Sequence, residues 1–371
     1  MWISLSLSLS LSLSLSRSLS LSLSTIYMGL SLDPCIHNKR IFMETSHLAK
    51  PTYLKEDEVS QECKTLLSTL PTESEWIDMT LYNYQGHWHY AKQLQGVLSC
   101  QQHFQSHDND ILLVTSPKSG TTWLKAILFS LVYRTRFKQT GDDHPLLSNN
   151  PHTLVPFLEL KLYFENENPD LSSFTSPRLF ATHLPYRSLP KSVQDSKCKL
   201  VYLCRNPKDI VVSLWAYANK LRLPEMGAKS IDEVFEKFCE GVSLYGPFWD
   251  HMLGYWHESL KNPEKIYFLT YEKMKEQPDL HLKKIADFLG CPFSPKEEEE
   301  NKVRAILDMC SFDFLSNLKV NREGTTPSGI NYNAFFRNGK VGDWKNYLTT
   351  EMVTRLDKIC EEKLEGSGLK L

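Results

Sequence analysis

A run of small and hydroxyl side chains around one lysine, residues 116–122, has the residue types that hold an anion. It follows an apolar run, 111–115, that is typical of a buried strand, and it precedes residues 123–133, which fit a helix packed on a sheet. A strand, a small-residue loop and a helix together present backbone N–H groups to an anion. The positive charge and the hydroxyl donors of this loop come from Lys118, Ser119, Thr121 and Thr122.

The loop differs from the common phosphate-binding loop in the place of its lysine. That motif reads Gly-x-x-x-x-Gly-Lys-Ser/Thr, whereas Lys118 stands two residues before Gly120, the only glycine of this loop. The pattern therefore predicts a P-loop-like anion site without a Walker sequence. A plain polar turn between a strand and a helix is the alternative at this point.

A second strand, turn and helix repeats this organisation further along the chain. Residues 199–204 are the clearest strand of the sequence, and an apolar helix is expected over 210–218. Arg205 ends the strand, and Ser213 lies in the first turns of the helix, near its positive pole. An arginine and a hydroxyl at this place suit a second phosphate group, with a capped helix and a surface ion pair as the alternative.

Two more predicted strands end in side chains that could contact a ligand. His183 follows residues 178–182, and Tyr271 lies at the end of residues 265–272. Ligands of open α/β sheets bind at the carboxyl ends of the strands. We therefore expect an α/β fold of one domain, with a central, mostly parallel sheet flanked by helices in a P-loop-kinase-like arrangement.

Composition narrows the class of protein. The chain has 371 residues, 41% hydrophobic and 23% charged, with a net charge of −2, which is ordinary for a globular protein. Near-neutral charge gives no argument for nucleic-acid binding, and no run reaches the ~20 apolar residues that a membrane span needs. Nine scattered cysteines without a Cys-x-x-Cys pair fit a reduced, cytoplasmic protein.

Leucine and serine alternate over most of residues 4–24, interrupted at Arg17. The segment lacks the continuous apolar core of a secretory signal, although its serines, its arginine and its lack of acids leave a transit peptide open. A CT dinucleotide repeat also translates as Leu-Ser. We interpret residues 1–42 as a low-complexity tail, either disordered or upstream of the true start, and assign residues 43–371 to one domain.

Aromatic side chains and two histidines gather around Gly86. His87 and His89 share one face of an extended segment, but zinc needs a third ligand and none is near in the sequence. We expect no metal and interpret the segment as one wall of an aromatic pocket, with plain core packing as the alternative. The pocket residues expected from this and later segments are Tyr82, Trp88, Tyr163 and Tyr245.

Together these stretches resemble the cytosolic sulfotransferases, and among them the plant branch. The resemblance runs in the expected order from about residue 75 to the end, and the Leu-Ser tail has no counterpart. The segments that carry it are similar to the family's 5′-phosphosulfate loop (117–123), catalytic histidine segment (182–185), 3′-phosphate strand and helix (202–209 with Ser213) and carboxyl-terminal Gly-x-x-Gly-x-x-Lys motif (336–346).

The resemblance implies transfer of a sulfuryl group from 3′-phosphoadenylyl sulfate to a hydroxyl of a small organic acceptor, by in-line displacement. His183 is then the base, and Lys118 neutralises the charge on the leaving phosphate oxygen. No metal is implied, because protein cations take its place. The donor-binding residues implied are Lys118, Ser119, Gly120, Thr121, Thr122, Trp123, Arg205, Ser213, Tyr271, Arg337, Asn338 and Gly339.

The chain departs from the family pattern in three places. Where the family often has Arg-Lys-Gly, this chain has Asn338 after Arg337, which removes one cation from the 3′-phosphate clamp. Many animal members carry a lysine two residues before the histidine, at the place of Ala181 here. The animal dimer motif is only partly present in residues 345–354, so the oligomeric state stays open.

Two other functions and several acceptors also stay open. A P-loop-like kinase is disfavoured by the missing Gly-Lys-Ser/Thr, and a non-catalytic nucleotide-binding protein by the presence of both His183 and Lys118. The predicted aromatic pocket favours a flavonoid or another phenol as acceptor. Brassinosteroids, hydroxyjasmonate and desulfoglucosinolates are the alternatives, and neither nucleic acid nor a membrane is an expected partner.

Overall fold

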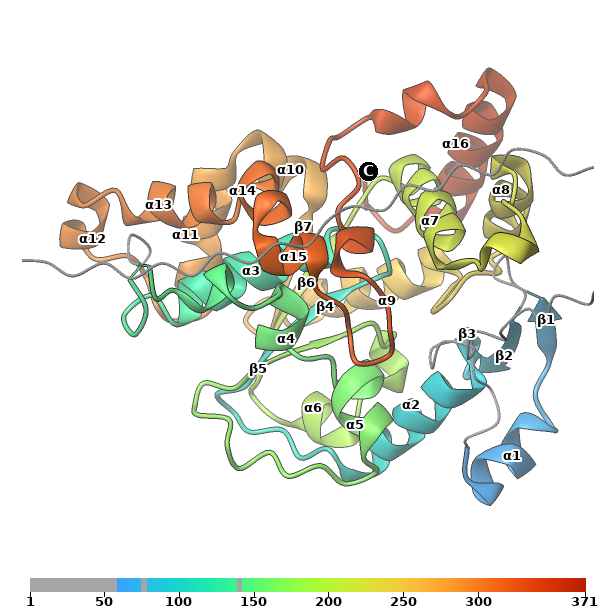
Figure 1. The fold of residues 1–371 in the computed structure, drawn as a ribbon, viewed down its shortest axis with the longest axis horizontal. Coiled ribbons are helices and arrows are strands. Elements are labelled where there is room, and N and C mark those ends of the chain that lie inside the picture. The colour runs from blue at the N-terminus through green and yellow to red at the C-terminus, as the bar shows by residue number, and fades with distance from the viewer. Residues whose placement is uncertain (1–58, 75–78, 139–141) are drawn as a thin grey trace, which may run out of the picture. The chain divides into compact units, whose positions relative to one another are not determined.

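The computed structural model describes residues 59–74, 79–138 and 142–371. The interpretation of residues 1–42 as a tail lies outside the described residues. The expected α/β architecture is confirmed: four parallel strands form a central sheet in the order β5-β4-β6-β7 (Figure 1). These strands are β4 (Ile111–Thr115), β5 (Leu179–Thr182), β6 (Lys199–Cys204) and β7 (Ile266–Thr270).

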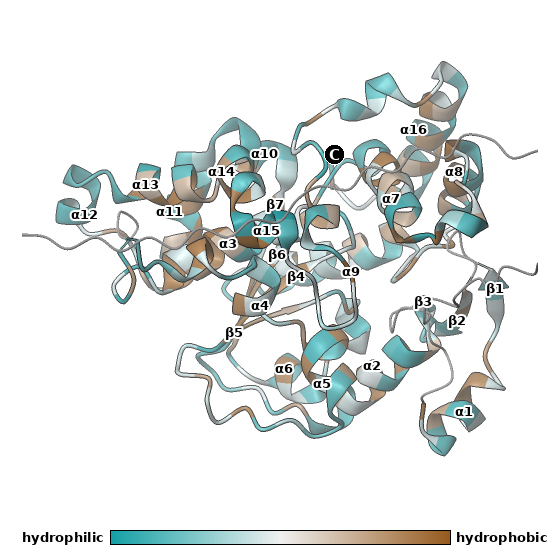
Figure 2. Ribbon diagram, in the orientation of Figure 1, coloured by the Kyte–Doolittle hydropathy of each residue, from teal (hydrophilic) through white to brown (hydrophobic). Residues whose placement is uncertain are grey.

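The central strands are apolar throughout because both faces of the sheet are covered. Successive side chains of β4 point to opposite faces, so that Ile111 and Leu113 join one apolar cluster while Leu112 and Val114 join another. Figure 2 shows the apolar residues gathered along these strands and on the inner sides of the helices. A parallel sheet covered in this way leaves the ends of its strands as the place for polar chemistry.

Helices from different parts of the chain form the two covering layers. One layer contains α3 (Thr121–Val132), α10 (Tyr271–Glu276), α11 (Pro278–Phe288), α13 (Lys302–Met309) and α14 (Phe312–Asn317). The other contains α1 (Gln61–Leu67), α2 (Ala91–His103), α6 (Lys191–Asp195), α7 (Pro207–Leu221), α8 (Ile231–Cys239), α9 (Phe248–Lys261) and α16 (Thr350–Leu364). The remaining α-helices are α4 (Pro151–Leu154), α5 (Tyr163–Glu165), α12 (Pro295–Glu299) and α15 (Lys319–Glu323).

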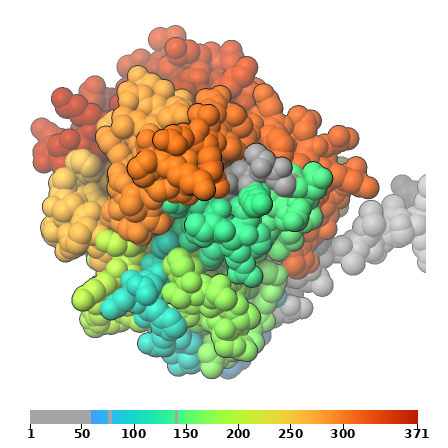
Figure 3. All heavy atoms as spheres, turned by 90° about the vertical axis from the view of Figure 1, so that its left-hand side faces the viewer, coloured from blue at the N-terminus to red at the C-terminus, as the bar shows by residue number. Residues whose placement is uncertain are grey.

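An ion pair joins the end of α3 to the helices that follow β7. Arg134 is buried and its Nε donates to Glu297 Oε1 of α12 at 2.8 Å. Figure 3 shows this face, where the orange atoms around residue 300 lie against green atoms that follow α3. The contact joins α12, which follows β7 in the chain, to the end of α3, which follows β4.

A small antiparallel sheet stands apart from the central one and consists of β1 (Thr72–Ser74), β2 (Thr80–Tyr84) and β3 (His87–Tyr90). Gln85 and Gly86 connect the last two strands with φ of +54° and +83°, the paired positive values of a tight hairpin turn. The aromatic segment around Gly86 is therefore a β-hairpin. It leads directly into α2, which begins at Ala91.

None of the helices in the described part of the chain combines the length and the apolarity that a membrane span requires.

Candidate active site

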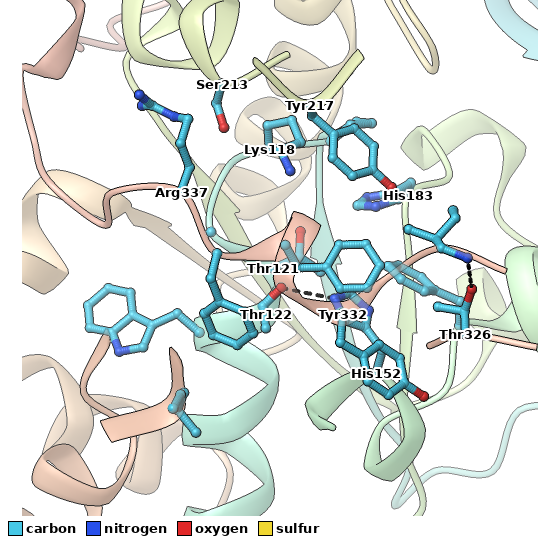
Figure 4. A pocket seen from close by; sticks show the side chains of 18 of the residues that line it. Lys118, Thr121, Thr122, His152, His183, Ser213, Tyr217, Thr326, Tyr332 and Arg337 are labelled. Atoms are coloured by element: carbon cyan, nitrogen blue, oxygen red, sulfur yellow. Dashed lines mark hydrogen bonds between the residues drawn. The ribbon is translucent and has the colours of Figure 1, made fainter. Parts of the chain in front are cut away.

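A cavity of about 850 Å³ opens at the carboxyl ends of the central strands. It brings together the first loop, the strand-end histidine, the second turn and the carboxyl-terminal loop (Figure 4). Ser119 is the exception among the predicted donor-binding residues, because it is buried and its hydroxyl bonds to Ser116 Oγ at 2.7 Å. The predicted residues that line the cavity are Lys118, Gly120, Thr121, Thr122, Trp123, His183, Arg205, Ser213, Tyr271, Arg337, Asn338 and Gly339.

The first loop turns sharply before α3. Lys118 and Gly120 both have positive φ, +68° and +108°, and the first value is unusual for a side chain with a Cβ. A Cβ on Gly120 would lie 2.8 Å from Tyr271 Cδ2, so only glycine lets the loop pass this ring. Gly120 also offers no capping side chain to α3, which leaves the first N–H groups of that helix available to an anion.

Several cations surround this loop. Burial, together with the nearby charges of Lys220, Arg337 and Arg205, lowers the pKa of Lys118 from 10.5 to about 7. Its Nζ lies 3.8 Å from the ring centroid of Tyr217, a residue that the sequence analysis did not select. A bound anion would relieve the repulsion among these cations, so the charge distribution fits a phosphate or sulfate group.

Asp209 of α7 connects the second turn to the carboxyl-terminal loop. Its carboxylate accepts the backbone N–H groups of Gly342 at 2.9 Å and Trp344 at 3.1 Å, and it lies 3.4 Å from Arg205 Nη2. Arg205 Nη2 also donates to the carbonyl oxygen of Lys340 at 2.7 Å. The acid therefore places the loop beside the arginine that ends β6.

The carboxyl-terminal loop is shaped by a second acid, Asp343. Arg337 Nη1 pairs with one oxygen of this carboxylate, and Asn338 Nδ2 donates to the other at 2.7 Å. Tyr271 donates its hydroxyl hydrogen to the carbonyl oxygen of Gly339 at 2.9 Å. Within the described residues, the buried Nε atoms of Arg205 and Arg337 have no hydrogen-bond partner, and both arginines line the cavity.

His183 is held in one tautomer. Its Nδ1 lies 2.6 Å from the carbonyl oxygen of Thr115 and 3.1 Å from Thr115 Oγ1. A carbonyl oxygen only accepts, so Nδ1 carries the hydrogen and Nε2 is left as the acceptor. Burial, with a further contribution from the charges of Lys125 and Lys118, lowers the pKa of His183 from 6.5 to about 3, which keeps the ring neutral at pH 7.

Two buried ionisable residues that the sequence did not indicate, Glu159 and Lys125, lie near this histidine. Glu159 accepts the backbone N–H of His183 at 2.7 Å and the hydroxyl of Thr182 at 2.8 Å. Lys125 is fully buried on α3, with its Nζ 3.4 Å from the ring centroid of Phe157, and burial lowers its pKa well below 10.5. The strand end that carries the histidine is thus fixed by a carboxylate from a distant segment.

Aromatic and apolar side chains also line the cavity, together with Lys92, Gln93, Lys161 and Glu165, but they are not the aromatic residues expected from the sequence. None of Tyr82, Trp88, Tyr163 and Tyr245 belongs to its lining. Tyr163 is buried edge-on against Phe104, and Tyr245 is buried with its ring 5.5 Å from that of His183. Tyr82 and Trp88 pack against the core from the hairpin. The apolar lining comes from Met79, Tyr90, Phe157, Leu160, Phe164, Leu244 and Ile330.

The hairpin still contributes to the lining of the cavity. Backbone N–H and carbonyl groups of Trp88 bond to Gly246 at 3.1 Å and to Tyr245 at 2.8 Å, and these contacts bring Leu244 to the cavity next to Tyr90. His89 is completely buried with both ring nitrogens unpartnered among the described residues. Over the same residues, no three His, Cys, Asp or Glu side chains are grouped to hold a metal ion.

The buried histidines predict a stability that falls in mild acid. Burial lowers the pKa of each below 6.5 in the folded protein, whereas the unfolded chain takes up protons as the pH falls through about 6.5. The unfolded state then binds more protons, so the free energy of unfolding should drop by roughly 1 kcal/mol per ring between pH 7 and 5.5. The rings concerned are His89, His183 and His251, with a pKa of about 3, and His152, with a pKa well below 6.5.

Urea unfolding at pH 7.0, 6.25 and 5.5 measures this effect. The four rings together should lower the free energy of unfolding by roughly 4 kcal/mol over that interval. A free energy of unfolding that stays flat or rises as the pH falls to 5.5 would contradict it.

Comparison with known proteins agrees with this geometry. The Sulfotransferase domain family matches residues 108–368, which contain the whole central sheet and every predicted donor-site residue. The chain belongs to the sulfotransferase family. Cytosolic sulfotransferase 12 of Arabidopsis thaliana is 48% identical over 327 residues, which are 88% of this chain and 99% of that protein.

Solved sulfotransferases share the fold. One from Arabidopsis thaliana is 44% identical with a TM-score of 0.69, and the match covers 86% of this chain and 99% of that one. Mouse sulfotransferase SULT7A1, solved in complex with PAP, the desulfated form of the donor, is 29% identical with a TM-score of 0.59. The match covers 77% of this chain and 95% of that one. The protein is therefore a sulfotransferase that uses 3′-phosphoadenylyl sulfate, and the kinase and the non-catalytic binding protein no longer stand as alternatives.

Proposed function

We propose that this sulfotransferase transfers the sulfuryl group to a phenolic hydroxyl of a small acceptor in the cytosol, with His183 as base. The observation that carries the proposal is the tautomer of His183. Its Nδ1–H is held by the Thr115 carbonyl oxygen, so its Nε2 is an acceptor in a cavity with a cationic end and an apolar end. That is the arrangement needed to bring an anionic donor and an apolar acceptor together.

The donor fits the cationic end. The N-terminus of α3, with Lys118 and Thr122, would hold the 5′-phosphosulfate, because free N–H groups, a hydroxyl and a cation converge there. Arg205, Ser213 and Arg337 would hold the 3′-phosphate, since two cations and a hydroxyl line the cavity there. Trp123 and Tyr271, whose ring centroids lie 5.2 Å apart, would contact the adenine.

The transfer requires little covalent chemistry from the protein itself. When bound, the donor supplies the sulfuryl group and a good leaving group, PAP, its desulfated form. His183 Nε2 takes the proton of the acceptor hydroxyl as that oxygen forms its bond to sulfur. Lys118 stabilises the negative charge that develops on the 5′-phosphate oxygen as the sulfur–oxygen bond breaks.

The acceptor class follows from the apolar end. Tyr90, Phe157 and Phe164 offer flat aromatic surfaces, and Met79 and Leu244 add apolar area around them. This lining favours a flavonoid or another phenol over a polar acceptor such as a desulfoglucosinolate, while brassinosteroids and hydroxyjasmonate remain the alternatives. A panel of these acceptors with radiolabelled donor tests the proposal, and transfer to aliphatic alcohols only would contradict it.

Replacing Arg205 with alanine should weaken PAP binding by roughly 10- to 100-fold, the usual contribution of a hydrogen bond to a charged group. Binding of adenosine 5′-phosphate, which lacks the 3′-phosphate, should barely change. Calorimetry on both nucleotides measures the two losses in binding free energy. The loss of the contacts of Arg205 with Asp209 and Lys340 would affect both nucleotides alike, so it cancels in the difference between the two losses. Equal weakening of both would show that Arg205 only supports the loop.

A further inference from the structure

The cavity contains a second histidine, His152, to which neither the sequence nor the proposed chemistry assigns a role. It lies on α4 directly after Asn150 and Pro151, and the Asn150 side chain accepts its backbone N–H at 2.8 Å. Its ring lies between two others, with centroid distances of 4.5 Å to Phe335 and 5.6 Å to Phe157. The helix cap and the aromatic contacts therefore fix both the backbone and the ring.

Among the residues that the structure describes, this ring makes one hydrogen bond, with the first loop. His152 Nε2 lies 2.9 Å from Thr122 Oγ1, the bond drawn between them in Figure 4. His183, in contrast, uses Nδ1 for its bond to Thr115 and has no hydrogen bond at Nε2 within the described ranges. The nitrogen that His152 presents to the loop is thus already engaged, which suits a residue that orients another group rather than one that takes a proton from the acceptor.

The direction of the bond follows from what Thr122 faces. Thr122 lies in the first turn of α3, where the free N–H groups and Lys118 gather around one anion site. A hydroxyl beside an anion stabilises it only by donating its hydrogen to it. Thr122 Oγ1 must then accept from His152, so Nε2 carries the hydrogen. Burial, together with Lys125, His183 and Lys118, lowers the pKa of His152 well below 6.5, so the neutral ring has one N–H to give.

We propose that His152 is a positioning residue for the donor: its Nε2–H holds Thr122 Oγ1 so that the threonine hydroxyl donates to the 5′-phosphate end. The inference rests on the proposed function, because it takes that end as the anion at Thr122. The two histidines of the cavity then have opposite tautomers. His183 is protonated at Nδ1 and accepts at Nε2, whereas His152 donates at Nε2.

A double-mutant cycle read by PAP binding tests the coupling. His152→Phe keeps the ring between Phe335 and Phe157 but removes the donor, and it should weaken PAP binding about tenfold, as expected for a lost hydrogen bond to a charged ligand. Thr122→Val should weaken it by a similar factor. In the Thr122→Val background, His152→Phe should cost less than about twofold. His152→Gln, which retains a donor at a similar reach, should stay within about threefold of wild type.

The same factor for His152→Phe in both backgrounds, or no effect in either, would overturn the inference. Wild-type protein that does not bind PAP would overturn the proposed function and this inference with it, so the two failures are distinguishable. Nuclear magnetic resonance of 15N-histidine-labelled wild-type protein tests the tautomers without any variant. It should show Nε2–H for His152 and Nδ1–H for His183, and Nδ1–H on His152 would contradict the proposal.

Discussion

Replacing His183 with glutamine is expected to lower kcat by roughly 10²- to 10⁴-fold, the usual contribution of a general base. The donor should still bind, because His183 lies at the end of β5 and its nearest hydrogen-bond partners are Thr115 and Glu159 rather than the cations. Glutamine has about the same reach and can still donate to the Thr115 carbonyl oxygen, but it lacks the acceptor nitrogen that takes a proton. Steady-state kinetics and PAP calorimetry measure the two quantities.

For His183 to be the base, His183→Gln must lower kcat while the affinity for PAP stays close to that of the wild type. An unchanged melting temperature and a PAP Kd within about threefold of wild type would show an intact nucleotide site. Retention of wild-type kcat would remove His183 from the reaction. Parallel loss of PAP binding and of kcat would make it a structural residue of the loop.

Lys118→Met should lower kcat by roughly 10²- to 10³-fold, as expected when a group that stabilises developing charge is removed. Methionine keeps the length of the side chain and its contact with the Tyr217 ring but not the charge. The unliganded pKa of about 7 adds a second expectation. An anion stabilises the protonated amine, so PAP binding should take up protons, and affinity should fall as the pH rises above 7.

Lys220→Met is the matched control for this variant. Lys220 is a nearby lysine whose charge helps to lower the pKa of Lys118, but it does not belong to the cavity lining. Its replacement should leave kcat within about threefold of wild type, since the lost charge is screened by solvent. Proton uptake on PAP binding, measured by calorimetry in buffers of different ionisation enthalpy, should disappear in Lys118→Met and persist in Lys220→Met. Equal losses of kcat in the two variants would contradict a specific role for Lys118.

The sequence predicted the parts of this molecule that local pattern determines. Residues 111–115 and 199–204 are apolar throughout because the sheet is covered on both faces, and both are strands with the expected bounds. Their following loops meet at one edge because parallel strands end together. The residues selected from these loops and those implied by the family resemblance therefore line one cavity, with the exception of Ser119.

The aromatic lining of the cavity depends on contacts that no local pattern contains. Tyr163 and Tyr245 are aromatic residues in plausible segments, but long-range packing buries both, and Tyr90 and Phe157 line the cavity instead. His152 gave no signal beyond a histidine after an Asn-Pro cap, since its partner Thr122 is 30 residues earlier in the chain. Side-chain partners of this kind are set by how segments pack together, not by their own composition.

The stereochemical course at sulfur tests the central claim, which is direct in-line transfer with a histidine that acts only as a base. The experiment uses a donor whose transferred sulfuryl group is chiral through oxygen isotopes, and it determines the configuration in the product ester. A single displacement onto the acceptor hydroxyl predicts inversion at sulfur. Retention would require two displacements through a sulfated side chain such as that of His183, and it would contradict the account.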